Sequence, residues 1–298
     1  MLEAVPSPYL VPFDGSFQRE LAPTHPGDRD PGKKACRQEL EASVDRMREL
    51  QRMLYAHDHH ALLLIFQAMD AAGKDGTIRA VMSGVNPMGC QVYSFKQPSA
   101  EELDHDFLWR TSRCLPERGR IGIFNRSHYE EVLVVRVHPE YLDAQRLPPD
   151  LDRSSNSSIW NDRFTSIRDH EAHLARNGTV ILKFWLNVSA DEQRQRFLAR
   201  IDEAEKNWKF SEGDVRERAH WDAYMRAYGE ALNATSRPWA PWYAIPADDK
   251  PYMRMVVSGI VVEALERLDL HYPRVGSADR ERLARMRALL EDPADGSK

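Results

Sequence analysis

A charged loop with an acid inside it is the part of the sequence best suited to chemistry. An apolar run at residues 61–66 precedes the loop, and Asp70 and Lys74 lie in the small-residue stretch that follows. The order of a buried strand, a tight loop, a lysine and a helix is typical of a phosphate-binding loop. In such a loop, backbone N–H groups and a helix N-terminus meet an anion. The residues expected to bind phosphate here are Ala71, Ala72, Gly73, Lys74, Asp75, Gly76 and Thr77.

The loop departs from the Walker A pattern, Gly-x-x-x-x-Gly-Lys-Ser/Thr, at two positions. Ala68 replaces the first glycine, and Asp75 replaces the residue that would bind magnesium. A carboxylate beside phosphate is repelled unless a cation lies between them, so Asp70 predicts a bound metal, expected to be Mg²⁺ or else Mn²⁺. The alternative is a strand followed by a capped helix, with Lys74 in solvent.

Apolar stretches that alternate with helical patterns predict an α/β fold. The predicted strands are residues 61–66, 90–95, 119–124, 179–186 and 242–245. The predicted helices are residues 33–55, 78–85, 99–114, 159–176, 249–268 and 279–290. Strands and helices in this order predict a three-layer α/β/α domain with a five-stranded parallel sheet.

Arginines gather around the predicted third strand and the region after the fourth. Arg126 comes just after the third strand, so it should face the same crevice as the loop after the first strand, because ligands bind at the carboxyl ends of parallel strands. Phosphoryl transfer needs in-line positioning, a metal and cations that absorb charge. The further candidate phosphate-binding cations are Arg113, Arg136, Arg196, Arg200 and Lys209.

Few candidate general bases accompany these cations. The sequence has no nucleophile elbow, no metal-ligand spacing of Cys and His, and no second glycine-rich dinucleotide loop. A hydroxyl acceptor usually needs a base to take its proton, whereas an ionised phosphate acceptor does not. The composition of the crevice therefore favours transfer from one phosphate to another.

Composition limits the other functional classes. The net charge of −5 gives no reason to expect nucleic-acid binding, and no run approaches the ~20 apolar residues of a membrane span. The N-terminus lacks the pattern of a signal peptide. Three widely spaced cysteines favour neither a disulfide framework nor a zinc site, so the cytoplasm is the expected location.

The chain is expected to form one domain with two additions. Residues 1–32 are rich in Pro, Gly and Asp and predict an N-terminal arm, and residues 33–298 predict a single domain. Within that domain, residues at about 200–222 are charged, with Trp208 and Phe210 interleaved, and predict a mobile lid.

Four blocks together resemble the polyphosphate kinase 2 family: residues 68–76, 124–129, 207–211 and 240–250. The resemblance implies a P-loop kinase fold similar to thymidylate kinase, with a helical lid. It also implies magnesium-dependent transfer of phosphate between inorganic polyphosphate and a nucleotide. By position, Asp70 corresponds to the family's metal-associated acid and Lys74 to its loop lysine, and Arg126 matches the arginine after the third strand.

One departure from the family pattern concerns the acceptor. Many members have an aspartate before the arginine, whereas this chain has Asn125, and it also carries Glu130. The combination resembles class III of the family, whose members phosphorylate both nucleoside monophosphates and diphosphates. The amide of Asn125 cannot bind magnesium as a carboxylate does. Glu130 either orients a metal or water for the shorter acceptor or pairs with a nearby arginine.

The leading hypothesis is therefore transfer of phosphate from polyphosphate to nucleoside mono- and diphosphates, AMP to ADP and ADP to ATP. An ATP-dependent nucleotide kinase of the same fold and a non-catalytic polyanion-binding protein are the alternatives. Asp70, Lys74, Arg126, Asn125 and Glu130 are the candidate catalytic residues. The resemblance also implies a homo-oligomer, for which the apolar face of the first helix is one candidate contact.

Overall fold

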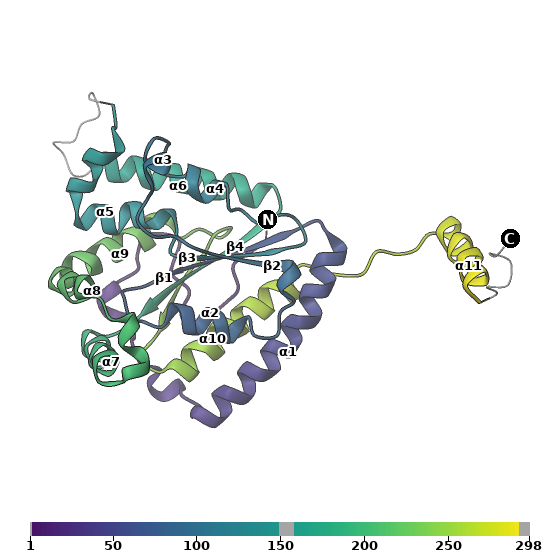
Figure 1. Ribbon diagram of the computed structural model, residues 1–298, viewed down its shortest axis with the longest axis horizontal. Helices are drawn as coiled ribbons and strands as arrows, with labels where there is room; N and C mark the ends of the chain where they lie inside the picture. The colour runs from purple at the N-terminus through teal and green to yellow at the C-terminus, as the bar shows by residue number, and fades with distance from the viewer. Residues whose placement is uncertain (1, 149–157, 292–298) are drawn as a thin grey trace.

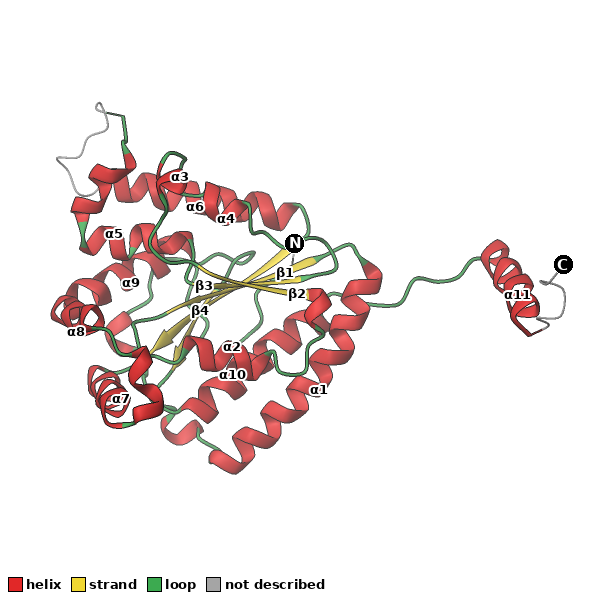
Figure 2. Cartoon of the chain, viewed as in Figure 1, coloured by secondary structure: helices red, strands yellow, loops and turns green. Residues whose placement is uncertain are grey.

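A five-stranded, fully parallel sheet forms the centre of the molecule (Figure 2). The computed structural model describes residues 2–148 and 158–291. Along the sheet the strand order is β2-β3-β1-β4-β5. The strands are β1 Ala61–Gln67, β2 Cys90–Ser94, β3 Ile121–Asn125, β4 Thr179–Asn187 and β5 Trp242–Pro246. Every residue of β1 is buried, as its unbroken apolar run predicts for a central strand, and the predicted parallel sheet is confirmed.

Helices cover both faces of the sheet, which makes three layers (Figure 1). The helices are α1 Lys33–His57, α2 Lys74–Val81, α3 Ala100–Leu103, α4 Trp109–Ser112, α5 Val134–Val137, α6 Ser158–Arg176, α7 Ala190–Asp202, α8 Glu212–Glu217, α9 Trp221–Thr235, α10 Lys250–Glu266 and α11 Ser277–Glu291. One layer holds α1, α2 and α10, and the other holds α6 and α9. The carboxyl ends of the strands point towards α7 and α8 (Figure 2).

Two predicted helices differ from the observed ones. The helix expected at residues 78–85 begins four residues earlier, at Lys74, because Gly73 adopts a φ of 107° and lets the loop turn directly into α2. The single helix expected at residues 99–114 is two short helices, α3 and α4. The side chain of Asp106 accepts a hydrogen bond from the Leu108 backbone N–H at 2.9 Å, which stabilises a turn where the helix would have continued.

The N-terminal arm continues the sheet at its β5 edge. The Val11 N–H donates to the Trp242 carbonyl at 2.9 Å, and the Ala244 N–H donates to the Tyr9 carbonyl at 2.8 Å, in antiparallel sense. Val5, Tyr9 and Val11 are buried in the hydrophobic core. The arm therefore covers an edge strand that would otherwise expose its hydrogen-bonding groups.

A helical excursion, α7 to α9, connects β4 to β5 and lies beside the carboxyl ends of the strands (Figure 1). At the other end of the molecule, α11 stands apart from the body on an extended segment. Within the described part of the chain, no helix is long and apolar enough to cross a membrane.

Candidate active site

The loop between β1 and α2 folds around the side chain of Lys74. Its ammonium donates to the Ala68 carbonyl at 2.7 Å and lies 3.5 Å from the Met69 carbonyl oxygen. Ala71 and Gly73 both have positive φ, 61° and 107°, so the loop is a tight turn that directs its backbone towards the helix N-terminus. Burial lowers the pKa of Lys74 to about 8, with the Arg126 charge adding to the effect.

Arg126 reaches the same loop from the end of β3. Its guanidinium donates to Asp70 Oδ1 at 2.6 Å, and its backbone N–H donates to the Phe66 carbonyl at 3.0 Å. The φ of Arg126 is 64°, a strained value for a residue with a side chain, and the turn that imposes it aims the guanidinium across the crevice. The prediction that the loops after the first and third strands face the same crevice is therefore confirmed.

Two further predicted residues lie around this pair. The Glu130 carboxylate is 3.6 Å from the Arg126 guanidinium. Burial raises the pKa of Glu130. The negative charge of Glu130 is the largest cause of a raised pKa for Arg126. Asn125 donates to Asp75 Oδ1 at 2.8 Å, which ties the end of β3 to the first turn of α2. Of the two roles open for Glu130, the contact with Arg126 favours charge pairing.

Arg196 of α7 donates hydrogen bonds to the backbone of this loop. Its NH1 group donates to the Ala71 and Ala72 carbonyls at 3.1 and 2.6 Å, and its NH2 group donates to two carbonyls after β5 at 2.7 and 3.1 Å. Its Nε donates to Glu192 at 2.7 Å, so all five guanidinium hydrogens have an acceptor. Phosphate binding was predicted for Arg196, but these contacts favour a role in positioning the loop.

The sequence reasoning missed Gln193, one turn before Arg196 on the same face of α7. Its amide donates to the Asp70 backbone carbonyl at 2.9 Å. The three-residue spacing from Arg196 was the signal that could have identified it, because residues i and i+3 share a helix face.

The region predicted as a lid approaches the loop through α8. Arg200 pairs with Asp214 at 3.2 Å. Burial raises the pKa of Asp214, and the negative charge of Asp70 raises it further, which indicates that α8 lies close to the loop. The side chain of Lys209, another predicted phosphate ligand, lies outside the described residues.

Two other residues predicted to bind phosphate contact side chains away from the loop. Arg113 stacks on Trp109, with 4.6 Å between the guanidinium carbon and the ring centroid, and its side chain is 60% exposed. Arg136 pairs with Glu230 of α9 and lies over Trp160. Neither contacts the loop residues, because the arginine-rich stretch around β3 spreads over both α3–α4 and α5 instead of converging.

The acidic groups present fit a magnesium ion held largely by substrate. Asp70 lies in the loop between β1 and α2, and within residues 2–148 and 158–291 no group of three or more His, Cys, Asp or Glu could hold a metal. Mg²⁺ is usually bound by one or two carboxylates together with waters and substrate phosphates. Asp70 would hold the ion, and a bridging cation would replace its contact with Arg126.

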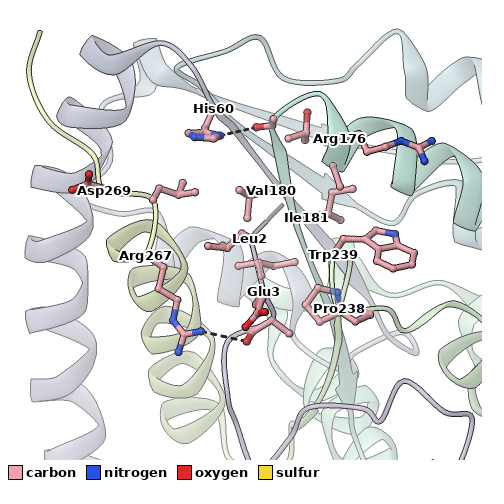
Figure 3. Close-up of a pocket in the computed structure, with 17 residues that line it drawn as sticks. Leu2, Glu3, His60, Arg176, Val180, Ile181, Pro238, Trp239, Arg267 and Asp269 are labelled. Carbon is pink, nitrogen blue, oxygen red and sulfur yellow. Dashed lines mark hydrogen bonds between the residues drawn. The ribbon is translucent and has the colours of Figure 1, made fainter.

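A separate cavity of about 380 Å³ lies at the opposite end of the sheet (Figure 3). It is lined by residues at the amino ends of the strands, including His60, Val180 and Trp239, and by Leu2 and Glu3 of the arm. None of the predicted site residues borders it. The candidate site is at the carboxyl edge, where parallel sheets bind ligands.

Comparison with known proteins agrees with this geometry. The model of the family described as polyphosphate kinase 2 matches residues 31–272. The chain belongs to the polyphosphate kinase 2 family. It is 58% identical over 251 residues to the ADP-polyphosphate phosphotransferase of Rhodopseudomonas palustris, a match that covers 84% of this chain and 86% of that protein.

Two further family members match along most of their length. The chain is 44% identical over 274 residues to the AMP/ADP-polyphosphate phosphotransferase of Meiothermus ruber, covering 92% of this chain and 97% of that protein. The crystal structure of polyphosphate kinase 2 from Arthrobacter aurescens TC1 superposes with a TM-score of 0.81 at 35% identity, covering 95% of this chain and 100% of that one. The P-loop kinase fold implied by the resemblance is thus confirmed.

Proposed function

We propose that this member of the polyphosphate kinase 2 family transfers the terminal phosphate of inorganic polyphosphate to nucleoside mono- and diphosphates, forming ADP from AMP and ATP from ADP. The observation that carries the proposal is the convergence of Lys74, Arg126 and Asp70 at the N-terminus of α2. The relatives named as ADP-polyphosphate and AMP/ADP-polyphosphate phosphotransferases support the choice of donor and acceptors.

The cations of the crevice would hold the transferring phosphate. The first-turn N–H groups of α2 and the Lys74 ammonium bind phosphate oxygens, and Arg126 neutralises charge that develops during transfer. Magnesium, when bound at Asp70, supplies positive charge to the phosphate oxygens. A cation held at Asp70 would take the place of its 2.6 Å contact with Arg126 and would leave the guanidinium free for substrate.

The acceptor needs no general base under this proposal. The attacking oxygen belongs to an ionised phosphate, so no proton has to leave it. The buried Glu130 instead holds Arg126 in place from its other side. Asn125, which donates to Asp75, is neutral and adds no negative charge to the crevice, which suits an incoming phosphate.

A matrix of donors and acceptors tests the proposal. The protein is incubated with Mg²⁺, with either polyphosphate or ATP as donor and AMP or ADP as acceptor, and nucleotides are resolved by chromatography. We expect ADP to form from AMP, and ATP from ADP, in the reactions where polyphosphate is the only phosphate donor present. Product formed with ATP but not with polyphosphate would replace the proposal with an ATP-dependent nucleotide kinase, and binding of polyphosphate without product would indicate a polyanion-binding protein.

A further inference from the structure

The segment predicted as a lid returns to the body of the protein at Glu217 and Arg218. Glu217 ends α8, and Arg218 begins the short turn that leads into α9. The Glu217 carboxylate accepts a hydrogen bond from the Tyr224 hydroxyl at 2.6 Å and lies 3.0 Å from His138 Nε2. One of these contacts is to α9 and the other is to the residue after α5. Together they fix the backbone from which the Arg218 side chain extends.

The Arg218 guanidinium contacts the first turns of α7. Its NH1 group donates to Gln193 Oε1 at 2.6 Å and to the Ala190 carbonyl at 3.1 Å. Gln193 is 1% exposed, and its Nε2 group donates to the Asp70 backbone carbonyl at 2.9 Å. A single buried amide therefore links the end of the predicted lid to the loop that carries the acid.

The chemistry of the two side chains fixes the direction of this link. A guanidinium has only hydrogen-bond donors, so the atom of the Gln193 amide that faces Arg218 has to be the oxygen. The amide nitrogen then faces the Asp70 carbonyl, which accepts from it. If the guanidinium were removed, the amide could rotate by half a turn, and its oxygen would then face the carbonyl oxygen and repel it.

We propose that Arg218 is a positioning residue for phosphate transfer, and that it acts through the Gln193 amide on the backbone of Asp70. The proposal rests on the function proposed above, because it bears on catalysis only if Asp70 takes part in the transfer. The Asp70 carboxylate contacts Arg126 at 2.6 Å. A carbonyl held on one side of this residue therefore helps to set where its carboxylate meets the guanidinium.

The Gln193 contact is the first of three that α7 makes to successive carbonyls of the loop. Arg196 donates to the carbonyls of Ala71 and Ala72 at 3.1 and 2.6 Å. Gln193, one turn earlier on the helix, donates to the carbonyl just before them. The orientation of Gln193 depends on a residue at the far end of the predicted lid. Loss of that residue should therefore release the first carbonyl and leave the other two held.

Amide hydrogen exchange and steady-state kinetics of full-length variants test the proposal. Gln193→Glu is the deciding variant, because its carboxylate still accepts from Arg218 but cannot donate to the Asp70 carbonyl. We expect Gln193→Glu and Arg218→Met to speed amide exchange in residues 68–76 several-fold. Both should also lower kcat for ATP formation several-fold, with the KM for ADP within about twofold of the wild type. Arg216→Met, in α8 with a 78% exposed side chain, is the matched control and should change neither exchange nor kinetics.

The two measurements separate this proposal from the proposed function. If the wild type forms no ATP from ADP and polyphosphate, the proposed function fails, and the exchange rates still decide whether Arg218 acts on the loop. Wild-type exchange and kinetics in Gln193→Glu would overturn the proposal, since Arg218 would then only fasten the end of the predicted lid to α7. Equal effects of Arg216→Met and Arg218→Met would overturn it as well. If Arg218→Met does not fold, Gln193→Glu, which keeps the size of its side chain, decides the question.

Discussion

At the scale of single residues, the site holds side chains of opposite charge close together. Asp70, Arg126 and Glu130 form a chain in which the arginine contacts one carboxylate at 2.6 Å and the other at 3.6 Å. Lys74 is buried beside them and donates to backbone carbonyls. Under the proposed function, a bound phosphate chain would replace part of this network, so that a loop containing an acid could bind an anion.

Asp70→Asn tests the acid of the loop. The amide keeps the size of the side chain but removes the charge that would hold a cation, so kcat should fall by about 10²-fold or more. Steady-state rates across a Mg²⁺ titration measure this. Asp191→Asn, in the first turn of α7 with a 93% exposed side chain, is the matched control and should retain full activity. Equal rates for the two variants would remove Asp70 from the mechanism.

The pH dependence of polyphosphate binding tests Lys74. Burial lowers its pKa to about 8, so the free enzyme loses this charge as the pH rises through that value. The charged form binds the anion, so affinity should fall above pH 8, and binding there should take up a proton. Calorimetry in buffers of different ionisation enthalpy measures the uptake. In Lys74→Arg, which stays charged, the uptake should vanish; if it persists, Lys74 is not the group that takes up the proton.

The sequence predicted residue positions better than residue roles. Asp70, Lys74 and Arg126 were predicted to meet because the ends of neighbouring parallel strands must meet. The role of Arg196 could not be predicted, because its acceptors come from the loop after β1 and from the segment after β5, far apart in sequence. Only the folded chain brings those carbonyls to one guanidinium.

At the scale of elements, α7 acts as a support for the loop between β1 and α2. Arg196→Met removes a buried guanidinium and leaves four carbonyls without their donor, which should lower the free energy of unfolding by about 2 kcal/mol or more. It should also raise the KM for polyphosphate. Urea unfolding and steady-state kinetics measure the two effects. Arg194→Met, on an exposed position of the same helix, should change neither, and a similar loss there would show a general effect on α7.

A buried ion pair fixes the turn after β3. Lys183 of β4 donates to Glu171 of α6 at 2.6 Å and to the Tyr129 hydroxyl at 2.8 Å, and all three are fully buried. Lys183→Met should lower the free energy of unfolding by about 3–5 kcal/mol, because it leaves a buried carboxylate unpaired. Adding Glu171→Leu should recover much of that loss. Denaturant unfolding checks this, and a double variant less stable than the single one would contradict it.

The boundaries of helices and strands were predicted correctly where local sequence signals alone determine them. The strands follow their apolar runs, and β1 coincides with the run at residues 61–66 extended by Gln67. The helix expected at residues 99–114 broke because the Asp106 side chain offers its own hydrogen bond to the backbone. A sequence pattern gives only a weak signal of such competition between a side chain and helical hydrogen bonds.

At the scale of the whole molecule, the N-terminal arm belongs to the core. Its composition predicted an arm but not its place, since pairing with β5 depends on an edge that only the assembled sheet provides. Deletion of residues 2–12 should uncover that edge and remove the burial of Val5, Tyr9 and Val11. The expected decrease in Tm is about 5–10 °C, measured by calorimetry. An unchanged Tm would mean that the arm contributes little to folding.

The central claim is that polyphosphate is the phosphate donor at the Asp70–Lys74–Arg126 crevice. Its most direct test measures ATP formation from ADP, Mg²⁺ and polyphosphate by wild type, Lys74→Ala and Lys34→Ala, the last being an exposed lysine in the first turn of α1. We predict ATP from the wild type and from Lys34→Ala, and a rate lower by at least about 10²-fold from Lys74→Ala. No ATP from the wild type, or equal rates for both lysine variants, would contradict the claim.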